Sequence, residues 1–291
     1  MKFGKVDNPE LVDFTLPPDH FETKRVLNNC TVNGKINLYI GCAKWSKTEL
    51  KDFYPKGTKD ELPYYSTQFN AIELNASFYR IFLPEQFKLW NEKTTKGFKF
   101  FPKLVQNISH FKRLSEDAQP YLDQFLASVI QLEEKLGMCF LQMPHNFAPK
   151  SIDRLEPFLQ KFPEDIPLAI EFRHKGWFED PKVFTALCDI LEAYKVTLIM
   201  TDSPGRRDVL SMRLTTNTAF IRFNSVNTEQ DKVRLDQWMH KFETWQKQGL
   251  QNIYLFIHQK INEDHPLLAA YVIKQANKKL GTQLSVPTML T

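Results

Sequence analysis

The stretch Pro167-Leu-Ala-Ile-Glu-Phe-Arg-His-Lys-Gly-Trp-Phe178 indicates both the fold and the place of a site. It begins as an apolar run that is too short for a helix. It then places Glu171, Arg173, His174 and Trp177 within seven positions, where the run stops. A buried strand that ends in such side chains is typical of the carboxyl edge of a parallel sheet or barrel, where binding sites lie. The stretch therefore predicts a strand with part of a site at its end.

The same pattern recurs along the chain. The predicted strands are 36–41, 71–75, 98–103, 138–142, 168–172, 196–200, 219–223 and 253–257. Helical spacing is seen at 61–69, 84–93, 119–136, 152–162, 182–194, 229–248 and 266–280, but only weakly at 206–217. Strands that alternate with helices predict a parallel sheet covered by helices. Eight units in 291 residues predict a (β/α)8 TIM-type barrel formed by residues 36–291 as a single domain.

An open doubly wound sheet is the structural alternative. Such a sheet normally carries a glycine-rich turn after its first strand, where it binds a dinucleotide. The corresponding turn here is Gly41-Cys-Ala-Lys-Trp45, which lacks that fingerprint. Phosphate-loop, HExxH, GxSxG and EF-hand patterns are also absent from the sequence.

Residues 1–35 are polar and rich in turn formers, but Leu11, Phe14 and Phe21 give them apolar surface. We expect an N-terminal extension that packs on the outside of the barrel and forms no domain of its own. The start has no apolar signal-peptide core, and no later segment approaches the length of a membrane span. We therefore expect a cytoplasmic protein without a membrane partner.

Composition leaves the ligand open. The net charge is +4, with 42% hydrophobic and 25% charged residues. This balance fits a globular chain and permits an anionic ligand, whereas a dedicated nucleic-acid binder usually shows a denser basic patch. The cysteines, Cys30, Cys42, Cys139 and Cys188, form no CxxC pair, and we expect Cys42 and Cys139 to act as small hydrophobes.

Polar and aromatic side chains collect at the predicted carboxyl ends of the strands. The residues expected to line this mouth are Trp45, Glu73, Asn75, Tyr79, Lys103, His110, Gln142, Glu171, Arg173, Trp177, Asp202, Arg222 and His258. A charged residue inside a strand is costly unless it is paired, so a polar network around the mouth is predicted. The competing interpretation is an ion-pair network that binds nothing, with aromatics that only cap the core.

We expect neither a metal nor another cofactor. Glu73, Glu171, Asp202 and His258 are suitable metal ligands by type, but Lys103, Arg173 and Arg222 would repel a cation. The loops after the last two strands lack the glycines of a backbone phosphate site. An anion would therefore be held by side chains.

Two segments carry a resemblance to a known family. Ile72-Glu-Leu-Asn-Ala-Ser-Phe-Tyr-Arg80 and Ala169-Ile-Glu-Phe-Arg-His174, followed by Trp177, resemble the YecE-like family, also called domain of unknown function 72. The resemblance runs from about Ile36 to near the C-terminus and implies a (β/α)8 barrel without an established reaction. The chain departs from the family pattern at Arg222-Phe-Asn-Ser225 and at His258-Gln-Lys260.

We predict an enzyme that acts on a small anionic or polyhydroxylated molecule by general acid–base chemistry. Glu171 or Glu73 would move the proton, while Lys103, Arg173 or Arg222 would hold negative charge. A nucleic-acid-binding or repair barrel and a non-catalytic ligand-binding barrel are the alternatives. If the strand ends form a solvated site, Glu171→Gln and Arg173→Ala should leave the melting temperature nearly unchanged and abolish ligand binding. The sequence indicates no oligomeric state.

Overall fold

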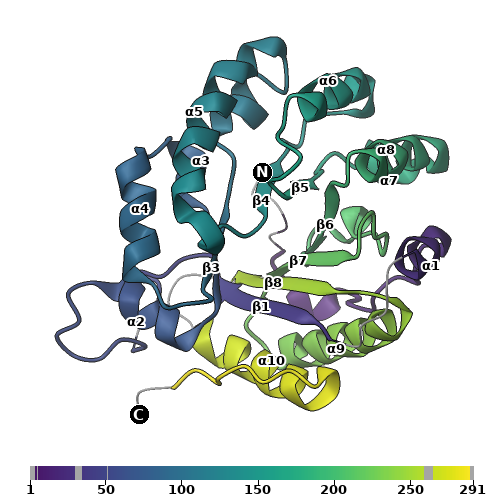
Figure 1. Ribbon diagram of the computed structural model, residues 1–291. Coiled ribbons are helices and arrows are strands. Elements are labelled where there is room, and N and C mark those ends of the chain that lie inside the picture. The colour runs from purple at the N-terminus through teal and green to yellow at the C-terminus, as the bar shows by residue number, and fades with distance from the viewer. Residues whose placement is uncertain (1–3, 5, 30–34, 51, 259–264, 289–291) are drawn as a thin grey trace.

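The computed structural model describes residues 4, 6–29, 35–50, 52–258 and 265–288, and the helices lie around the outside of the strands (Figure 1). Each predicted strand is present within two residues of its expected bounds. The strands are β1 (Asn37–Cys42), β2 (Ala71–Leu74), β3 (Lys99–Pro102), β4 (Cys139–Gln142), β5 (Leu168–Glu171), β6 (Thr197–Asp202), β7 (Thr218–Asn224) and β8 (Asn252–His258).

All strand pairs are parallel. Six strands form one curled sheet in the order β1-β8-β7-β6-β5-β4, and β2 pairs with β3 in a second, two-stranded sheet. The chain is therefore a mixed α/β protein with a half-barrel of parallel strands. The complete eight-stranded ladder predicted from the sequence is not formed by backbone pairing alone.

Side chains bridge β1 and β2, which share no backbone ladder. The Asn70 amide accepts a hydrogen bond from the Ile40 N–H at 3.0 Å and donates to the Leu38 carbonyl at 2.7 Å. The Tyr65 hydroxyl accepts from the Cys42 N–H at 2.8 Å and donates to the Ala71 carbonyl at 3.1 Å. These bonds satisfy backbone groups that the missing ladder would leave unpaired.

Two isolated backbone bonds join β3 to β4. The Gly137 N–H donates to the Phe100 carbonyl at 2.8 Å, and the Leu104 N–H donates to the Phe140 carbonyl at 2.8 Å. Both gaps between the two sheets are thus crossed by hydrogen bonds.

The helices follow the predicted positions closely. They are α1 (Phe21–Asn28), α2 (Glu61–Gln68), α3 (Ala76–Tyr79), α4 (Pro84–Lys93), α5 (Gln119–Val129), α6 (Leu155–Gln160), α7 (Gly176–Glu179), α8 (Pro181–Ala193), α9 (Gln230–Gln248) and α10 (His265–Leu280). Local signals explain the ends: the Asp180 side chain caps α8 by accepting from the Lys182 N–H at 2.8 Å, and α9 stops at Gly249, whose φ is 119°.

Some helical predictions need correction. The predicted helices 119–136 and 152–162 each combine an α-helix with a 3-10 segment, Ile130–Lys135 in the first and Pro149–Arg154 in the second. The stretch 206–217 holds only the 3-10 turn Arg207–Val209. Helices α1, α3 and α7 were not predicted. Helices α3 and α7 span four residues each, which is too short to show an apolar period, and α1 lies in the polar, turn-rich N-terminal extension.

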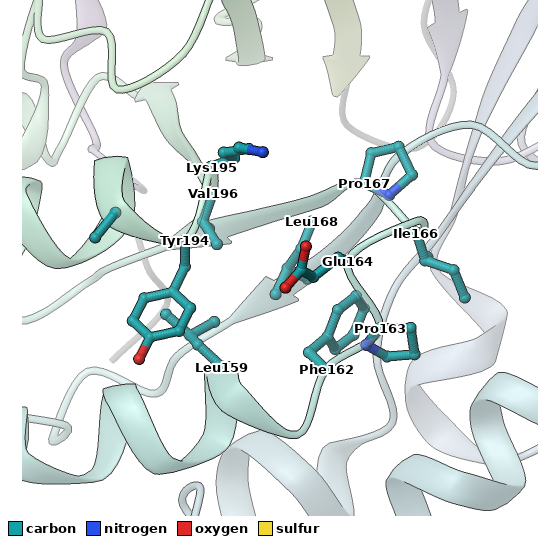
Figure 2. Close-up of a pocket in the computed structure, with 11 residues that line it drawn as sticks. Leu159, Phe162, Pro163, Glu164, Ile166, Pro167, Leu168, Tyr194, Lys195 and Val196 are labelled. Atoms are coloured by element: carbon teal, nitrogen blue, oxygen red, sulfur yellow. The ribbon is translucent and has the colours of Figure 1, made fainter.

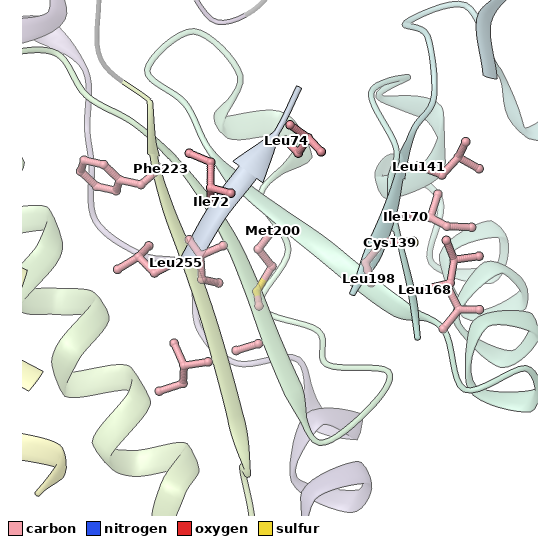
Figure 3. Close-up of a cluster of buried hydrophobic side chains, with 14 of the residues drawn as sticks. Ile72, Leu74, Cys139, Leu141, Leu168, Ile170, Leu198, Met200, Phe223 and Leu255 are labelled. Atoms are coloured by element: carbon pink, nitrogen blue, oxygen red, sulfur yellow. The ribbon is translucent and has the colours of Figure 1, made fainter. Parts of the chain in front are cut away.

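The two faces of the strands build two clusters. The outward side chains, among them Ile72, Leu141, Ile170 and Leu255, pack in the larger cluster together with helix residues (Figure 3). Inward residues from all eight strands form a second cluster: Tyr39, Ala71, Phe101, Met138, Phe140, Ala169, Ile199, Phe220, Tyr254 and Phe256. Strand alternation separates the two sets. Cys42, Cys139 and Cys188 are buried thiols, while Cys30 lies outside the described residues.

The described part of the N-terminal extension contacts the β6–β7 side of the molecule. Thr23 Oγ1 donates to the Met212 carbonyl at 2.8 Å, and the Phe14 ring lies 4.3 Å from the Arg234 guanidinium of α9. Gly4, in contrast, reaches the carboxyl end of β6, where its carbonyl accepts from the Gly205 N–H at 3.0 Å. These contacts are the ones expected of a packed extension, and the division at residue 35 stays a prediction.

Candidate functional site

One row of side chains forms the site. Each member stands two residues after an inward residue of its strand, so alternation points it to the same interior. The row is Gly41, Glu73, Lys103, Gln142, Glu171, Thr201, Arg222 and His258. We call Glu73, Asn75, Lys103, Gln142, Glu171, Arg173, Arg222 and His258 the mouth cluster, since they lie at the carboxyl ends of the strands.

Glu73 is fully enclosed by partners. Arg222 donates to both of its oxygens, from Nε at 2.9 Å and from Nη2 at 2.8 Å. Asn75 Nδ2 donates at 2.7 Å, and His258 Nε2 lies 3.1 Å from Oε2. Such a two-pronged arginine contact is the strongest arrangement for a buried carboxylate.

Glu171 links the other half of the mouth cluster. Arg173 Nε donates to its Oε1 at 2.7 Å, and Arg222 Nη1 and Gln142 Nε2 donate to Oε2, the latter at 2.7 Å. Gln142 Oε1 in turn accepts from Lys103 Nζ at 2.8 Å. Lys103 makes no ion pair within the described part of the chain.

The two carboxylates are held ionised. Burial would raise the pKa of Glu73, but Arg222 and His258 outweigh it and hold the pKa well below its usual value. Burial would also raise the pKa of Glu171. The charges of Arg173 and Arg222 and the hydrogen bond from Gln142 outweigh it, so the pKa of Glu171 is lowered as well. Carboxylates in this state are poor proton donors and acceptors near neutral pH.

Lys103 has the opposite character. Burial, together with the charges of Arg222 and Arg173, lowers its pKa to about 7 against the opposing pull of Glu171 and Glu73. Its Nζ lies 4.1 Å from the centre of the Phe78 ring. Burial and the charges of Lys103 and Arg173 lower the pKa of neighbouring His110 to about 4, so that imidazole is neutral at pH 7. A lysine whose pKa lies near neutral pH can exchange a proton there.

A cavity of about 1040 Å³ adjoins the mouth cluster. Arg173 belongs to both, and His110 lines the cavity from a single π-helical turn, Asn107–Phe111. A smaller cavity of about 320 Å³ lies at the opposite ends of β5 and β6, beside Leu168 and Val196 (Figure 2). In barrel-like folds that opposite end serves stability and the carboxyl end serves chemistry.

Asp202 does not lie in the mouth cluster, contrary to the sequence expectation. It is buried behind β6, where its Oδ1 accepts from Arg234 Nη2 at 2.7 Å and from Arg207, and its Oδ2 accepts from Trp238 Nε1 at 2.8 Å. Alternation explains the difference, because Asp202 is one residue beyond the inward Thr201.

Three expected aromatic residues also lie apart from the mouth cluster. Trp177 is fully buried against Phe147, and its Nε1 donates to the Phe147 carbonyl at 2.7 Å. Trp45 is half-buried, edge to face with Trp90 at 5.8 Å between ring centres. The Tyr79 side chain is 70% exposed. Trp177 is therefore a core residue, and no stacking wall is formed by these three.

Thr201 was missed by the sequence analysis. Its Oγ1 is buried and has no hydrogen-bond partner among the described residues. In the ladder it stands opposite Arg222. Alternation from Ile199 would have identified it. Phe78, on the short helix α3, and the loop residues Arg113 and Arg206, which line the cavity, follow no such period. An orphaned buried hydroxyl is costly and needs an explanation, such as a ligand or an ordered water.

The carboxylates of the mouth cluster are poor metal ligands in this arrangement, because guanidinium groups already occupy their oxygens. Among the described residues, no three side chains of the metal-binding types come together. The absence of a metal remains a prediction. Within the same residues, no helix combines the length and apolar character needed to cross a bilayer.

Burial revises the stability expectation for Glu171. Its side chain is 1% exposed and satisfies two arginines, so Glu171→Gln should destabilise the fold instead of leaving it unchanged. Arg173 is 20% exposed and stands at the edge of the cavity. Arg173→Ala removes one partner of the buried Glu171 and should therefore also cost stability, but less than Glu171→Gln because water can reach this edge. The loss of ligand binding stays a prediction for both variants.

Parallel strands inside a surround of helices, with a polar cluster at the strand carboxyl ends, define a TIM-barrel-like α/β protein. The chain belongs to the DUF72 family, described as "Protein of unknown function DUF72", whose model matches residues 39–289. The resemblance to the YecE-like family is therefore confirmed.

Individual relatives agree with this assignment. The UPF0759 protein YecE of Escherichia coli K12 is 26% identical over 274 residues, which cover 87% of this chain and 97% of the relative. The UPF0759 protein YunF of Bacillus subtilis is 30% identical over 153 residues, covering 50% and 53%. A solved DUF72 family structure from Enterococcus faecalis V583 covers 86% of this chain and 100% of its own, with a TM-score of 0.67 and 17% identity. That likeness supports the fold alone.

Proposed function

We propose that the protein is an enzyme that binds a small anionic substrate at the mouth cluster and uses Lys103 for general acid–base chemistry. The observation that carries the proposal is the charge balance of the buried groups. Arg173, Arg222 and protonated Lys103 stand against two carboxylates, Glu73 and Glu171. These five side chains carry one excess positive charge when Lys103 is protonated, and an anion would balance it.

The roles differ from those expected from the sequence. Glu73 and Glu171 hold the two arginines in place and stay ionised, while Lys103 gives or takes the proton. The orphaned Thr201 hydroxyl offers a further donor to a bound oxygen. Since the donors are mainly cationic, we favour an anionic substrate over an uncharged polyol.

Sulfate provides the test, because its charge is constant near neutral pH. Calorimetry at about pH 8, in buffers that differ in ionisation enthalpy, measures the protons taken up on binding. We expect sulfate to bind with uptake of about one-half to one proton, because the bound anion raises the pKa of Lys103. The Lys103→Met variant should bind sulfate at least about tenfold more weakly and take up none.

A matched control is Lys88→Gln, which removes an exposed charge on α4 and should alter neither quantity. Sulfate binding that is unchanged in Lys103→Met, or that takes up no proton in the parent protein, would contradict the proposal.

A nucleic-acid-binding role is the second candidate. The exposed rings of Tyr79 and Phe111 favour it, since bare aromatics can stack on bases. Against it, Lys103 and Arg222 are buried, whereas a nucleic-acid backbone is bound by cations that line an exposed groove. Strongly salt-dependent binding of a single-stranded oligonucleotide, without sulfate binding, would favour this role.

The proposed site requires that all eight strands surround the same interior. We propose that they form a closed barrel in which side-chain hydrogen bonds join β1 to β2. Gly41 supports this: a Cβ there would stand 2.0 Å from the Ala71 carbonyl of β2. The Tyr65 hydroxyl makes two of the bridging bonds.

Tyr65→Phe tests the closure. It removes only the hydroxyl and should cost about 1–3 kcal/mol, because a buried N–H and a buried carbonyl lose their partner. Tyr64→Phe is the control, since Tyr64 is half-buried on the same helix and should cost less than about 0.5 kcal/mol. Equal stability of Tyr65→Phe and the parent in urea unfolding would show that the hydroxyl does not seal the gap.

A further inference from the structure

The cavity beside Arg173 is too large for a single small anion. Its volume of about 1040 Å³ reaches the upper end of the roughly 300–1,000 Å³ usual for pockets that enclose organic ligands. The loops that follow β3, β4, β5 and β6 line it, with Arg113, Pro144, Lys175 and Arg206 among the contributors. It opens on the side of the mouth where Arg173 holds Glu171.

Cationic side chains outnumber carboxylates in the lining of the cavity. Arg113, Arg173, Lys175 and Arg206 line it, and Asp208 is the only carboxylate among the described lining residues. Asp208 accepts from Arg206 Nε at 2.8 Å and from Arg206 Nη2 at 3.0 Å, so the charges of these two residues offset each other. Arg173 pairs with Glu171 and Lys175 pairs with Glu179. Among the described residues, Arg113 is the lining cation that has no carboxylate partner. Burial lowers the pKa of His110, and the nearby charges of Lys103, Arg173 and Arg113 lower it further.

Backbone contacts fix the two outer arginines. Arg206 Nη2 donates to the Arg173 carbonyl at 2.8 Å, which ties the β5 and β6 loops together. Arg113 Nε donates to the His110 carbonyl at 3.3 Å. Arg113 and Leu114 have φ values of 48° and 60°, a left-handed conformation that costs each non-glycine residue energy. Strain of this kind persists where surrounding structure holds a side chain in position.

The cavity also has an apolar part. Pro144 lines it together with Phe111, whose side chain is 65% exposed. An exposed aromatic ring beside guanidinium groups suits a ligand that has a carbon framework between its charges.

We propose that this cavity is a second anion subsite, formed by Arg113 and Arg206, so that the substrate is an elongated organic molecule with an anionic group at each end. One end would reach Arg173 and Lys103 in the mouth cluster, and the other would lie beside Arg113 and Arg206. This inference rests on the proposed function, because it assumes that the inner end binds an anion.

Phosphonates of increasing length test it. Methylphosphonate presents one anionic group, and α,ω-alkane bisphosphonates present two at increasing separation. We expect the best bisphosphonate to bind about 100-fold more tightly than methylphosphonate in calorimetry at constant ionic strength, because the second group binds with a high effective concentration. Affinity should peak at an intermediate chain length.

Variants locate the second group. Arg113→Asn keeps a residue that tolerates the left-handed backbone, and together with Arg206→Gln it should remove most of the bisphosphonate advantage. Methylphosphonate affinity should change less than about twofold. Lys88→Gln, on the outer helix α4, should change neither.

The outcomes separate the two proposals. Equal affinity for methylphosphonate and every bisphosphonate would overturn the second subsite and leave the mouth cluster intact as an anion site. A bisphosphonate advantage that survives in the double variant would also overturn it. Failure of all phosphonates to bind, in a protein that also fails to bind sulfate, would overturn both.

Discussion

Arg222→Met is expected to lower the free energy of unfolding by about 3–5 kcal/mol. Arg222 is the only residue that bonds to both buried carboxylates within the described part of the chain, and its removal leaves Glu73 and Glu171 short of compensating charge. With an unfolding entropy of about 2.1 cal/mol/K per residue over 291 residues, that loss corresponds to a fall in Tm of roughly 5–8 °C. Urea unfolding and thermal melts measure it.

Arg25→Met is the matched control. Arg25 also pairs with two carboxylates, Glu22 and Glu192, but its side chain is 47% exposed. Exposed ion pairs contribute about 0–1 kcal/mol, so this change should cost less than about 1 kcal/mol. A loss that small in Arg222→Met would mean that water, not Arg222, compensates the carboxylates.

The pH dependence of stability on the acidic side tests the same contact independently. The pKa values of Glu73 and Glu171 are lowered in the folded protein, so the folded state binds fewer protons than the unfolded state. Their stabilisation is present above the ordinary glutamate pKa of 4.5 and is lost as pH falls below it. The stability difference between the parent and Arg222→Met should therefore shrink as the pH is lowered from neutral.

Lys103→Met is expected to stabilise the protein at about pH 7, by roughly 1–4 kcal/mol. The folded pKa of Lys103 is about 7 and its ordinary value is 10.5, so the unfolded chain binds more protons between these values. The lysine consequently costs stability below pH 7, and this cost fades as pH rises toward 10.5. Methionine removes the buried charge at similar volume, although Gln142 Oε1 loses its lysine donor.

The expected signature is a pH-dependent difference. The advantage of Lys103→Met over the parent should shrink between about pH 7 and about pH 10. Lys135→Met is a contrasting control: Lys135 is also buried, but it donates to the carbonyls of Asn91 and Thr94 at 2.5 and 2.7 Å, so its loss should destabilise. If Lys103→Met destabilises by the same amount at every pH, Lys103 is a structural lysine.

Strand positions were predictable because they depend on local apolar runs. The pairing was not, because no pattern in the sequence shows that β1 and β2 are joined by Asn70 and Tyr65 in place of a ladder. In the sequence, Asn70 is a loop residue just before β2 and Tyr65 is a tyrosine within α2, and neither position signals a bridging role.

The site was predictable in part for the same reason. Counting by two from an inward residue places Glu73, Glu171 and Arg222 together, and the structure does bring them together. The prediction for Asp202 was off by one position, because the end of a strand does not by itself indicate which face of the sheet a side chain lies on. The prediction for Trp177 differs from the structure because an indole beside a charged segment can equally well pack in the core, as this one does.

The division of roles could not be read from residue types. Glutamate is a common acid or base, but two arginines around Glu171 lower its pKa, and that partnership is a property of the folded chain. Lys103 directly follows β3, and its lowered pKa results from burial and from the guanidinium groups nearby. Both lowered pKa values therefore depend on tertiary contacts, which no sequence pattern shows.

The most direct test is the titration of Lys103 itself. In protein with carbon-13 at the lysine ε position, the signal that is missing from Lys103→Met identifies this residue, and its chemical shift against pH gives the pKa. We predict a midpoint near pH 7. A midpoint near the ordinary value of 10.5 would contradict Lys103 as the acid–base group of an anion site.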